Sequence, residues 1–325
     1  MNEEKIYQLV IIGAGPGGLT AGLYASRARI DTILVEKAIE GGQILVTDWI
    51  DNYPGFPEGV SGFELAEKMK AQAMRFGLSY LNNSVASMAL EEEIKTITFE
   101  DGTAIQARAV IVATGARPNK LNVPGEKELA GKGVSYCATC DGPFYRDLNI
   151  AVVGGGDTAV QEAVYLTKFA KSVTVIHRRD ELRAAPILQE EAFAHPQVAF
   201  QCDAEVIEII GEKGVESLKV KHSDGTEEVL PFDGVFILIG VTPNNEMLPP
   251  GQLEMENGFI ITDCMMQTSL AGVMAIGDIR HNSIRQVVSA AGDGAVAEKA
   301  VEHYLDTLRQ KKVLVVERKK CSQHS

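Results

Sequence analysis

The sequence predicts an α/β protein of two similar domains, and three observations lead to this prediction. The chain has 325 residues, enough for two domains of about 150 residues each. An apolar run from Tyr7 to Ile12 ends in a glycine-rich turn at 13–18, and small, helix-favouring residues follow up to Arg29. The same order of strand, glycine turn and helix recurs, and its glycine turn begins at Gly154, 141 residues after Gly13. This spacing is too long for a solenoid repeat and suits two Rossmann-like domains.

Composition and charge argue against several classes of protein. Hydrophobic residues make up 45% of the chain and charged residues 23%, which are ordinary values for a folded globular protein. The net charge of −13 repels phosphodiester backbones and anionic lipid surfaces, so we expect no nucleic-acid partner. Apolar runs are short, such as Val235 to Ile239, whereas a membrane span needs roughly 20 residues. We therefore expect no membrane segment.

The N-terminal residues and the cysteine count bear on the cellular compartment. Residues Met1 to Gln8 lack the charged-then-apolar pattern of a secretory signal, so we expect a cytoplasmic protein. Five cysteines in a chain of this length do not make a disulfide framework. In a reducing compartment most of them are expected to be thiols.

The first glycine turn fits the pattern G-x-G-x-x-G at Gly13, Gly15 and Gly18. Glycines at these positions let the backbone approach a pyrophosphate that sits at a helix N-terminus. A second apolar run, Thr32 to Val35, ends at Glu36, where an acid could accept hydrogen bonds from a ribose. The alternative is a glycine-rich surface turn. The motif alone does not distinguish FAD from NAD.

The second turn fits G-x-G-x-x-A at Gly154, Gly156 and Ala159, between apolar runs at 149–153 and 173–176. The second of these runs ends in a basic cluster instead of an acid. An acid there would repel a ribose 2′-phosphate, whereas arginines bind it through charge-assisted hydrogen bonds, so NADPH is favoured over NADH. The alternative is a solvated basic strand end, with Asp180 and Glu181 as neighbours. The cluster consists of His177, Arg178, Arg179 and Arg183.

A C-x-x-C motif is the candidate redox centre. Cys137 and Cys140 can close a small disulfide, and Asp141 directly after them could exchange a proton with a cysteine sulfur. A zinc site is the competing interpretation, but the second ligand pair that it needs is missing, and we expect no metal. A thioredoxin-like domain is disfavoured because the pair lies just before a dinucleotide strand. The remaining cysteines are expected to be ordinary thiols: Cys202, Cys264 and Cys321.

Two segments rich in Pro, Gly or Lys are expected as linkers around a middle domain, Pro118 to Gly133 and Thr242 to Gly251. After the second linker, the apolar run Val273 to Ile276 ends in Gly277-Asp278, and a helix is expected from about Arg285 to Leu308. This last part of the chain is expected to rejoin the first domain. No nucleophile elbow, zinc-protease or P-loop motif is present, so redox chemistry is what remains.

Taken together, these motifs resemble the low-molecular-weight thioredoxin reductases, which are flavoprotein NADPH:disulfide oxidoreductases, over the chain up to about Leu308. The resemblance rests on the order of the motifs, since each one alone is weak. The motifs are 13–18, Gly41-Gly42-Gln43, Ala113-Thr114-Gly115, 137–142, 154–159, 177–183, Ala275-Ile276-Gly277-Asp278 and Arg285-Gln286.

The resemblance implies an NADPH-binding domain, with the C-x-x-C centre, inserted into a discontinuous FAD-binding domain. The expected ranges are 1–117 and 248–325 for the FAD domain and 118–247 for the NADPH domain. Hydride would pass from NADPH to the flavin and then open the Cys137/Cys140 disulfide, which exchanges with the disulfide of thioredoxin. Cys140 would face the flavin, Cys137 would attack the partner, and Asp141 would act as acid and base. A rotation at the linkers between half-reactions and a homodimer are also implied.

The resemblance also implies the cofactor-binding residues. The expected FAD residues are Gly13, Gly15, Pro16, Gly18, Glu36, Gly42, Gln43, Asn52, Thr114, Gly115, Asp278, Arg285, Gln286 and Val287. The expected NADPH residues are Gly154, Gly156, Asp157, Thr158, His177, Arg178, Arg179, Arg183, Ile239 and Gly240.

Two departures from the family pattern leave the partner open. Pro143-Phe144 stands where the family often has two aromatic residues that contact thioredoxin, and the tail from Lys311, with Cys321, has no assigned role. A sibling enzyme with another partner is therefore the alternative, such as a reductase of a peroxiredoxin-type or glutaredoxin-like carrier, a ferredoxin-fed reductase or a small-dithiol oxidase. The arginines disfavour the last two, which have no need of NADPH. A non-catalytic flavin redox sensor is the alternative of a different class.

Overall fold

The computed structural model describes residues 5–47 and 49–322, and the chain forms two compact units. Unit 1 is built from the chain up to Arg117 and again from Pro243 onward, and unit 2 is the stretch between them, Pro118–Thr242. One unit is thus inserted into the other, in agreement with the fold class that the sequence predicts. The observed second crossing lies five residues before the expected boundary at 247, because Asn244 binds the backbone of unit 1: its Nδ2 donates to the Thr114 carbonyl at 2.8 Å.

Unit 1 contains a seven-stranded mixed sheet in the order β3-β2-β1-β6-β5-β4. Strand β6 pairs with β1 on one side. On its other side it pairs with β5 at Ala104–Ala107 and with β19 at Val110–Val112, so the segment after unit 2 returns to this sheet as expected. Strands β3, β2, β1, β6 and β19 are parallel to their neighbours in this group, and β4 and β5 are antiparallel. The strands are β1 (Ile6–Ile12), β2 (Thr32–Glu36), β3 (Ser79–Asn82), β4 (Val85–Ala89), β5 (Lys95–Phe99), β6 (Ala104–Val112) and β19 (Val273–Ala275).

Both faces of the unit 1 sheet are covered, which explains the continuous apolar run in β1. Leu9 and Ile11 face one hydrophobic core, together with residues of the long helices, and Val10 and Ile12 face a second core on the other side. The two sets alternate because successive side chains of a strand point to opposite faces. The helices are α1 (Pro16–Arg27), α2 (Gly62–Met74) and α6 (Val287–Ser322), with short 3-10 helices η1 (Gly42–Val46) and η3 (Gly277–Ile279) and a small ribbon of β17 (Met255–Glu256) and β18 (Phe259–Ile260).

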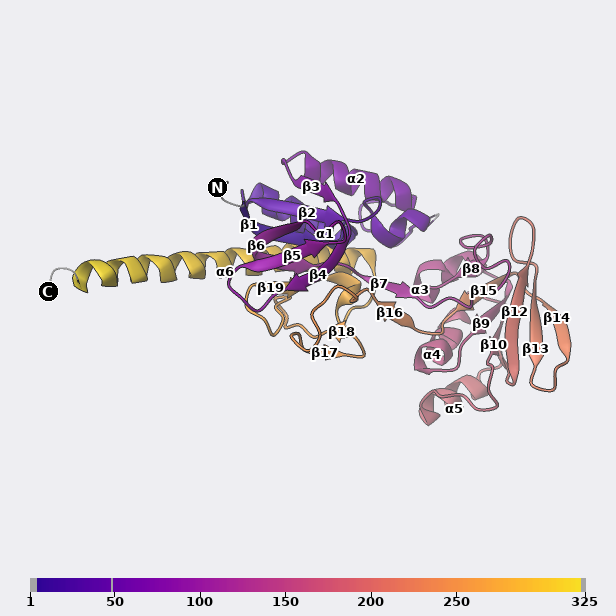
Figure 1. Ribbon diagram of the computed structural model, residues 1–325. Helices are drawn as coiled ribbons and strands as arrows, with labels where there is room; N and C mark the ends of the chain where they lie inside the picture. Colours follow the sequence, from indigo (N-terminus) through magenta and orange to yellow (C-terminus); the bar gives the residue numbers. More distant parts are fainter. Residues whose placement is uncertain (1–4, 48, 323–325) are drawn as a thin grey trace. The chain divides into compact units, whose positions relative to one another are not determined.

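Helix α6 lies tightly against α1 and is longer than the sequence predicts. A Cβ atom on Gly294 would lie 2.5 Å from the Gly17 carbonyl oxygen, so the two helix backbones approach closely. The helix starts at Val287 and continues to Ser322 (Figure 1), past the expected end at Leu308. No Gly, Pro or Asn follows Gly294 before the helix ends, so the sequence contains no strong stop signal. No helix of the described part is long and apolar enough to cross a membrane.

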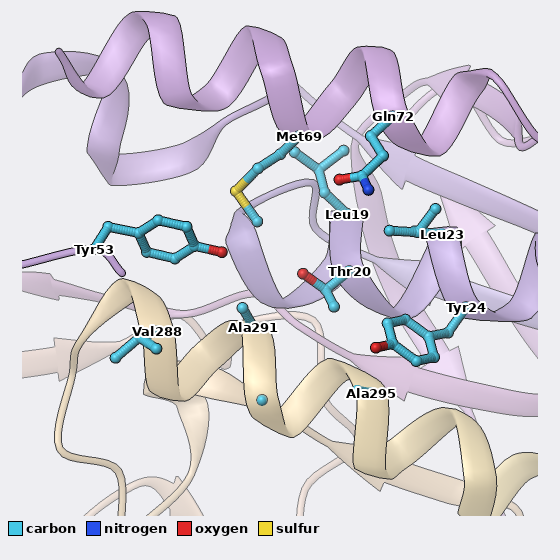
Figure 2. Close-up of a pocket in the computed structure, with 11 residues that line it drawn as sticks. Leu19, Thr20, Leu23, Tyr24, Tyr53, Met69, Gln72, Val288, Ala291 and Ala295 are labelled. Atoms are coloured by element: carbon cyan, nitrogen blue, oxygen red, sulfur yellow. The ribbon is translucent and has the colours of Figure 1, made fainter. Parts of the chain in front are cut away.

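A groove of about 400 Å³ lies on unit 1 between α1, α2 and α6 (Figure 2). Apolar side chains line it together with the polar atoms of two tyrosines, Thr20 and a glutamine. Tyr24 and Val288 are 37% and 43% exposed, so the groove presents apolar surface to solvent. The lining residues include Leu19, Leu23, Tyr24, Tyr53, Met69, Gln72, Val288 and Ala295.

Unit 2 contains a five-stranded parallel sheet in the order β11-β10-β9-β15-β8 and a separate three-stranded antiparallel sheet, β12-β13-β14 (Figure 1). One face of the parallel sheet packs on α4 and the other on the antiparallel sheet. The strands are β8 (Val134–Ser135), β9 (Asn149–Val153), β10 (Ser172–Ile176), β11 (Val198–Gln201), β12 (Ala204–Ile210), β13 (Ser217–His222), β14 (Glu227–Pro231) and β15 (Gly234–Ile237). The helices are α3 (Ala138–Asp141), η2 (Gly142–Tyr145), α4 (Asp157–Leu166) and α5 (Pro186–Ala194).

The two segments expected as linkers are partly packed, since each contains buried residues among exposed ones. In the first, Glu126 and Leu129 are each only 3% exposed, and the Glu126 carboxylate accepts hydrogen bonds from the Leu121 and Asn122 amides and the Tyr136 hydroxyl. In the second, Leu248 lies in a core of unit 1. The chain crosses between the units in two short paired strands, β7 (Ala116–Pro118) and β16 (Val241–Pro243). Pro, Gly and Lys content identified the region of the crossings but not which residues are packed.

Candidate functional site

The first glycine turn connects β1 to α1 at the carboxyl end of the unit 1 sheet. Gly13 has φ +106°, and a Cβ atom there would lie 2.4 Å from the Ala113 carbonyl oxygen. A Cβ atom on Gly18 would lie 1.8 Å from the Gly13 carbonyl oxygen, so this glycine lets α1 pack against the turn. A Cβ atom on Gly15, in contrast, would meet no atom within 4 Å. Helix α1 then begins with Pro16, and its N-cap residue, Gly15, has no side chain to cap the N-terminal amides.

Glu36 and η1 border this turn. The Glu36 carboxylate ends β2 and accepts the Ala14 amide at 2.8 Å and the Ala38 amide at 3.1 Å. Gly42, the first residue of η1, lies against the turn as well, since a Cβ atom there would be 3.2 Å from the Gly15 Cα. The next residue, Gln43, donates from its side chain to the Ala116 carbonyl. The acid and the glycines that the sequence predicts for one ligand are thus neighbours.

Asp278 follows β19 and lies in η3, on the same side of unit 1. Burial raises the pKa of its carboxyl, and Arg285 and a 3.4 Å hydrogen bond from Ser283 oppose this shift only in part. The turn is held by Asp293 of α6, whose carboxylate accepts the Gly277 amide at 3.0 Å and Arg280 at 2.8 Å. A largely buried carboxyl with one long hydrogen bond among the described residues suits a ligand hydroxyl as a further hydrogen-bond donor.

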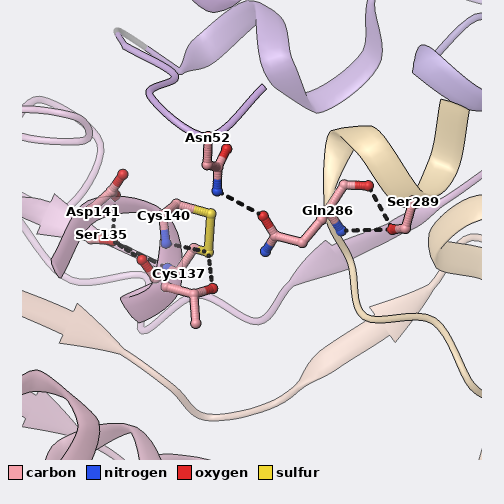
Figure 3. Close-up of a disulfide and its surroundings, with 8 residues drawn as sticks. Asn52, Ser135, Cys137, Cys140, Asp141, Gln286 and Ser289 are labelled. Carbon is pink, nitrogen blue, oxygen red and sulfur yellow. Dashed lines mark hydrogen bonds between the residues drawn. A yellow bond between two sulfur atoms is a disulfide. The ribbon is translucent and has the colours of Figure 1, made fainter. Parts of the chain in front are cut away.

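The other residues expected around the flavin belong to unit 1 too. Asn52 donates from its side chain to the Gln286 side-chain oxygen at 3.0 Å (Figure 3). Thr114 donates to the Asn244 carbonyl at 2.7 Å, and a Cβ atom on Gly115 would meet open space. Val287 packs against the small apolar cluster that includes Ile44 of η1.

These features fit a dinucleotide in unit 1. Strands β1, β2, β6 and β19 all end beside the turn, and ligands of parallel α/β sheets bind outside the carboxyl ends of the strands. The open space at Gly15 leaves room for a pyrophosphate at uncapped helix amides. Glu36 at the end of β2 is placed for a ribose, and Asp278 offers a second carboxyl for hydroxyl groups.

The second glycine turn repeats this arrangement in unit 2. Gly154 has φ +155°, and a Cβ atom there would lie 2.5 Å from the Leu238 carbonyl oxygen and 2.7 Å from the Ala159 Cβ. A Cβ atom on Gly156 would meet nothing within 4 Å, as at Gly15 of the first turn. Helix α4 starts directly after it, at Asp157, whose carboxylate accepts the Ala185 amide at 2.7 Å.

The basic cluster folds back onto this turn. The Gly155 carbonyl accepts the Arg183 amide at 2.6 Å, so the loop after β10 is tied to the glycine turn. Within the described chain, no ion pair is found for Arg178, Arg179 or Arg183, and all three side chains are exposed. Three unpaired guanidinium groups beside a glycine turn suit a phosphate, which planar guanidinium groups bind in a bidentate manner. Unit 2 therefore fits NADPH.

The His177 ring packs against the second glycine turn, at Gly155. A Cβ atom on Gly155 would lie 2.4 Å from two atoms of the His177 ring, so the middle glycine of the motif makes room for this imidazole. The ring is 6% exposed, and its Nε2 atom has no hydrogen-bond partner among the described residues. Burial, followed by Arg183 and Arg179, lowers its pKa, so the ring is neutral at physiological pH.

Ile239 and Gly240 follow β15 on the same side of unit 2. Their carbonyl oxygens accept the side-chain and backbone amides of Asn119, at 3.3 and 3.0 Å. Every residue expected for NADPH therefore lies in unit 2, and every residue expected for FAD lies in unit 1. The roles of the individual residues remain predictions.

Cys137 and Cys140 form a disulfide at the start of α3 in unit 2, with their Cα atoms 5.3 Å apart (Figure 3). Both cysteines are partly exposed, and the Cys140 amide donates to the Cys137 sulfur at 3.2 Å. Asp141 belongs to the same helical turn, and its amide donates to the Cys137 carbonyl at 3.1 Å. Two electrons can open this bond, and the carboxyl group next in sequence can exchange protons with the site.

The sequence did not predict the contacts that three residues make around the sites. Ser135 donates to the Asp141 carboxylate, Gly155 accommodates the His177 ring, and Asp293 holds the turn that contains Asp278. Ser135 lies two residues before the C-x-x-C motif and Gly155 lies inside the second glycine motif, so adjacency was the available signal. Asp293 lies 16 residues from its partner Gly277 and carried no local signal.

In the part of the chain that is described, no group of three or more His, Cys, Asp or Glu side chains could hold a metal ion. Cys202 and Cys264 are free thiols. The side chain of Cys321 and the last three residues of the tail, 323–325, lie outside what the structure describes.

Each unit has a dinucleotide cradle, by which we mean its glycine turn and the strand ends beside it. Two such cradles and a C-x-x-C disulfide define a nucleotide-dependent disulfide oxidoreductase. Residues 7–294 match the family described as pyridine nucleotide-disulphide oxidoreductase. The chain is 46% identical to a thioredoxin reductase of Listeria innocua over 95% of its length and 97% of that protein, and 46% identical to one of Bacillus subtilis over 95% and 98%. The crystal structure of a thioredoxin reductase from Streptococcus pyogenes covers 94% of the chain and 100% of its own, with a TM-score of 0.90 at 44% identity.

The chain belongs to the pyridine nucleotide-disulphide oxidoreductase family. It is an oxidoreductase, and its cofactors are FAD and NADPH. The resemblance identified from the motifs is confirmed, since relatives of the expected kind cover nearly the whole chain.

Proposed function

We propose that this protein is a thioredoxin reductase, which transfers two electrons from NADPH through FAD and the Cys137–Cys140 disulfide to the disulfide of thioredoxin. The observation that carries the proposal is that disulfide, in a unit that also contains an arginine-lined dinucleotide cradle. The relatives that cover the chain almost end to end are named for this activity. The overall reaction balances as NADPH, one proton and a partner disulfide going to NADP⁺ and a partner dithiol.

When bound, FAD accepts a hydride from NADPH and supplies two electrons to the protein disulfide. Opening the Cys137–Cys140 bond leaves two sulfurs that need up to two protons to become thiols. Asp141 can give a proton to one sulfur or take one back, since it is part of the same turn. In the unit 1 cradle, Glu36 would hold the FAD ribose and Asp278 a hydroxyl of the ribityl chain.

The dithiol then acts on the partner. Cys137 as a thiolate attacks one sulfur of the partner disulfide, and the second partner sulfur leaves and takes a proton. Cys140 next attacks the mixed disulfide, re-forms the Cys137–Cys140 bond and releases the partner as a dithiol. Cys140 would be the sulfur nearer the flavin, and a rotation at the two crossings, β7 and β16, would alternate the nucleotide and the dithiol at the flavin.

Other reductase partners remain the second candidate because one surface feature differs from the family pattern. Pro143 and Phe144 are exposed just after the disulfide, and Phe144 is 47% exposed. A single aromatic ring there supports a partner contact, although the family often has two. Assays with thioredoxin, a glutaredoxin-like carrier, a peroxiredoxin-type carrier and dioxygen as electron acceptors separate these functions.

We further propose that the protein is a cytoplasmic homodimer, as the resemblance implies. The apolar groove between α1, α2 and α6 supports unit 1 as the contact surface (Figure 2). Light scattering is expected to give twice the chain mass of 35.1 kDa, and Tyr24→Glu in the groove is expected to give the single-chain mass. A single-chain mass for the unmodified protein would contradict the homodimer.

The proposed function is tested by anaerobic titration of the flavin-loaded protein with NADPH, followed by flavin bleaching. About two equivalents are expected, because flavin and disulfide each accept two electrons. Cys140→Ser is expected to need about one equivalent, and Cys202→Ser, which changes a free thiol of the same unit, about two. One equivalent for the unmodified protein, or no bleaching by NADPH, would overturn the proposal.

A further inference from the structure

Ser135 connects the two sides of the disulfide turn. It is the last residue of β8 and is only 2% exposed. Its hydroxyl donates to the Asp141 carboxylate at 2.5 Å and accepts the Cys137 amide at 3.1 Å (Figure 3). A strand residue thus links the backbone of one redox cysteine to the carboxylate that follows the other.

The direction of these hydrogen bonds follows from their lengths. The Ser135 hydroxyl has one proton and two nearby acceptors, the Asp141 carboxylate at 2.5 Å and the Cys137 carbonyl at 3.4 Å. The shorter distance is typical of a hydroxyl that donates to an ionised carboxylate, which is the stronger kind of hydrogen bond. The Cys137 amide donates to the same hydroxyl and polarises it further.

A largely buried phenol, that of Tyr145, lies close enough to Asp141 to be affected by its charge. Burial raises the pKa of the Tyr145 phenol, and the negative charge of Asp141 raises it further. The phenol of Tyr145, which belongs to η2, therefore stays neutral. Its ring is held against Phe236 of β15 at 4.9 Å between centroids. The two cysteines become titratable as well when the disulfide opens. Ser135 stabilises the carboxylate without itself changing charge.

We propose that Ser135 is a positioning residue for proton transfer at the dithiol: its hydroxyl holds the Asp141 carboxylate against the turn that carries both cysteines. This inference rests on the acid and base role of Asp141 in the proposed function. When the Asp141 carboxyl gives its proton to an opening sulfur, it becomes a carboxylate and a better acceptor, so the bond from Ser135 strengthens as the proton leaves. No electron or atom is exchanged with Ser135.

Removing the hydroxyl therefore has a definite sign. A hydrogen bond to the ionised form of a carboxyl lowers its pKa, so Ser135→Ala is expected to raise the pKa of Asp141 by about one unit. Ser135→Thr keeps the hydroxyl on a β-strand, where a β-branched residue is well tolerated, and is expected to restore the original value.

The experiment measures kcat against pH for thioredoxin-dependent NADPH oxidation by the flavin-loaded protein and its variants. Asp141→Asn identifies the limb of the profile that belongs to Asp141, because that limb disappears. In Ser135→Ala the same limb is expected to move up by about one pH unit, with the KM for NADPH unchanged. Ser172→Ala is the matched control, because it removes a hydroxyl of the same unit that donates to Asn149 at 2.8 Å, and its profile is expected to match the unmodified protein.

A second measurement works without any partner and covers a variant that turns over poorly. The NADPH-reduced dithiol is alkylated with iodoacetamide across the same pH range, and Ser135→Ala is expected to shift the pH dependence of the rate in the same direction. If Asp141→Asn removes a limb but the Ser135→Ala profile matches the unmodified protein in both measurements, the inference about Ser135 is overturned alone. If Asp141→Asn changes neither profile, the acid and base role in the proposed function fails, and the inference falls with it.

Discussion

The glycine turns of units 1 and 2 have the same backbone arrangement but different surroundings. Gly13 and Gly154 both adopt positive φ angles against a neighbouring backbone carbonyl, and Gly15 and Gly156 both leave open space at the start of a helix. After the turn, β2 of unit 1 ends in an acid, whereas β10 of unit 2 ends in a buried imidazole and exposed arginines. The turn is alike in the two units, so the residues at the next strand end, an acid or a group of arginines, are what distinguish the two expected nucleotide sites.

The largest expected effect comes from the sixth position of the two motifs, which is Gly18 in unit 1 and Ala159 in unit 2. Gly18→Ala puts a Cβ atom 1.8 Å from the Gly13 carbonyl oxygen, so the backbone of the turn must shift, and we expect a loss of about 3 kcal/mol of stability and of most of the bound flavin. Ala159→Gly is the reverse change and is expected to cost about 1 kcal/mol. Flavin absorbance per chain and urea unfolding measure both effects. A Gly18→Ala protein that purifies with full flavin would contradict the packing argument.

The arginines at the end of β10 test the difference between the strand ends. The double variant Arg178→Ala, Arg179→Ala removes two charge-assisted contacts to a 2′-phosphate, and we expect kcat/KM for NADPH to fall about 100-fold while that for NADH changes little. Steady-state kinetics with both nucleotides measure the change. Lys213→Ala, an exposed cation of the same unit, is the control. An equal decrease in kcat/KM with NADPH and with NADH would show that the arginines do not bind the 2′-phosphate.

Phe144 tests whether unit 2 also presents the partner surface. It is 47% exposed next to the disulfide turn, so Phe144→Ala is expected to raise the KM for thioredoxin about 10-fold, with the NADPH titration unchanged. Phe193→Ala, an aromatic of α5 that is 58% exposed, is expected to leave that KM unchanged. If Phe144→Ala and Phe193→Ala have the same KM for thioredoxin, Phe144 does not contact the partner.

The smallest expected effect is a pH dependence that His177 gives to unit 2. Its pKa in the folded protein lies below the ordinary 6.5, so below that pH the unfolded chain binds more protons than the folded one, and stability falls as the pH drops. His177→Phe keeps a ring against Gly155 but cannot be protonated, so its Tm is expected to fall less between pH 7.5 and about 5.5. His303→Gln, an exposed histidine, serves as control. Parallel Tm curves for wild type and His177→Phe would contradict the assignment.

Much of this molecule follows from local sequence pattern. The strand at 149–153 has the expected bounds, and both glycine turns connect a strand to a helix as predicted. The C-x-x-C pair forms a disulfide because Cys137 directly precedes the helical turn that contains Cys140, which brings the two sulfurs together. In each case the residues that matter lie within a few positions of one another, where backbone geometry alone limits the outcome.

Other features escaped the sequence analysis because they depend on contacts between distant segments. Glycine and proline content predicted a linker at 118–133, but the buried Glu126 carboxylate collects three hydrogen bonds and packs that segment into unit 2. The carboxylate of Asp293 reaches back from α6 to the turn at Gly277. The hydrogen-bond partners of Glu126 and Asp293 could not be predicted from the sequence, because many other polar residues could have made the same bonds.

By itself, the sequence determined the two strand–turn–helix units, their order, the redox pair and the charge difference between the two strand ends. Each is set by short-range backbone geometry or by side-chain charge, which depend only on the residues themselves and their neighbours in sequence. Only the tertiary structure decided that Gly155 makes room for His177, that the chain crosses at 117–118 and 242–243, and that Ser135 links Asp141 to Cys137. These depend on close packing and on hydrogen-bond partners that come together only when separate elements dock, and a buried polar group accepts whichever partner the fold brings within reach.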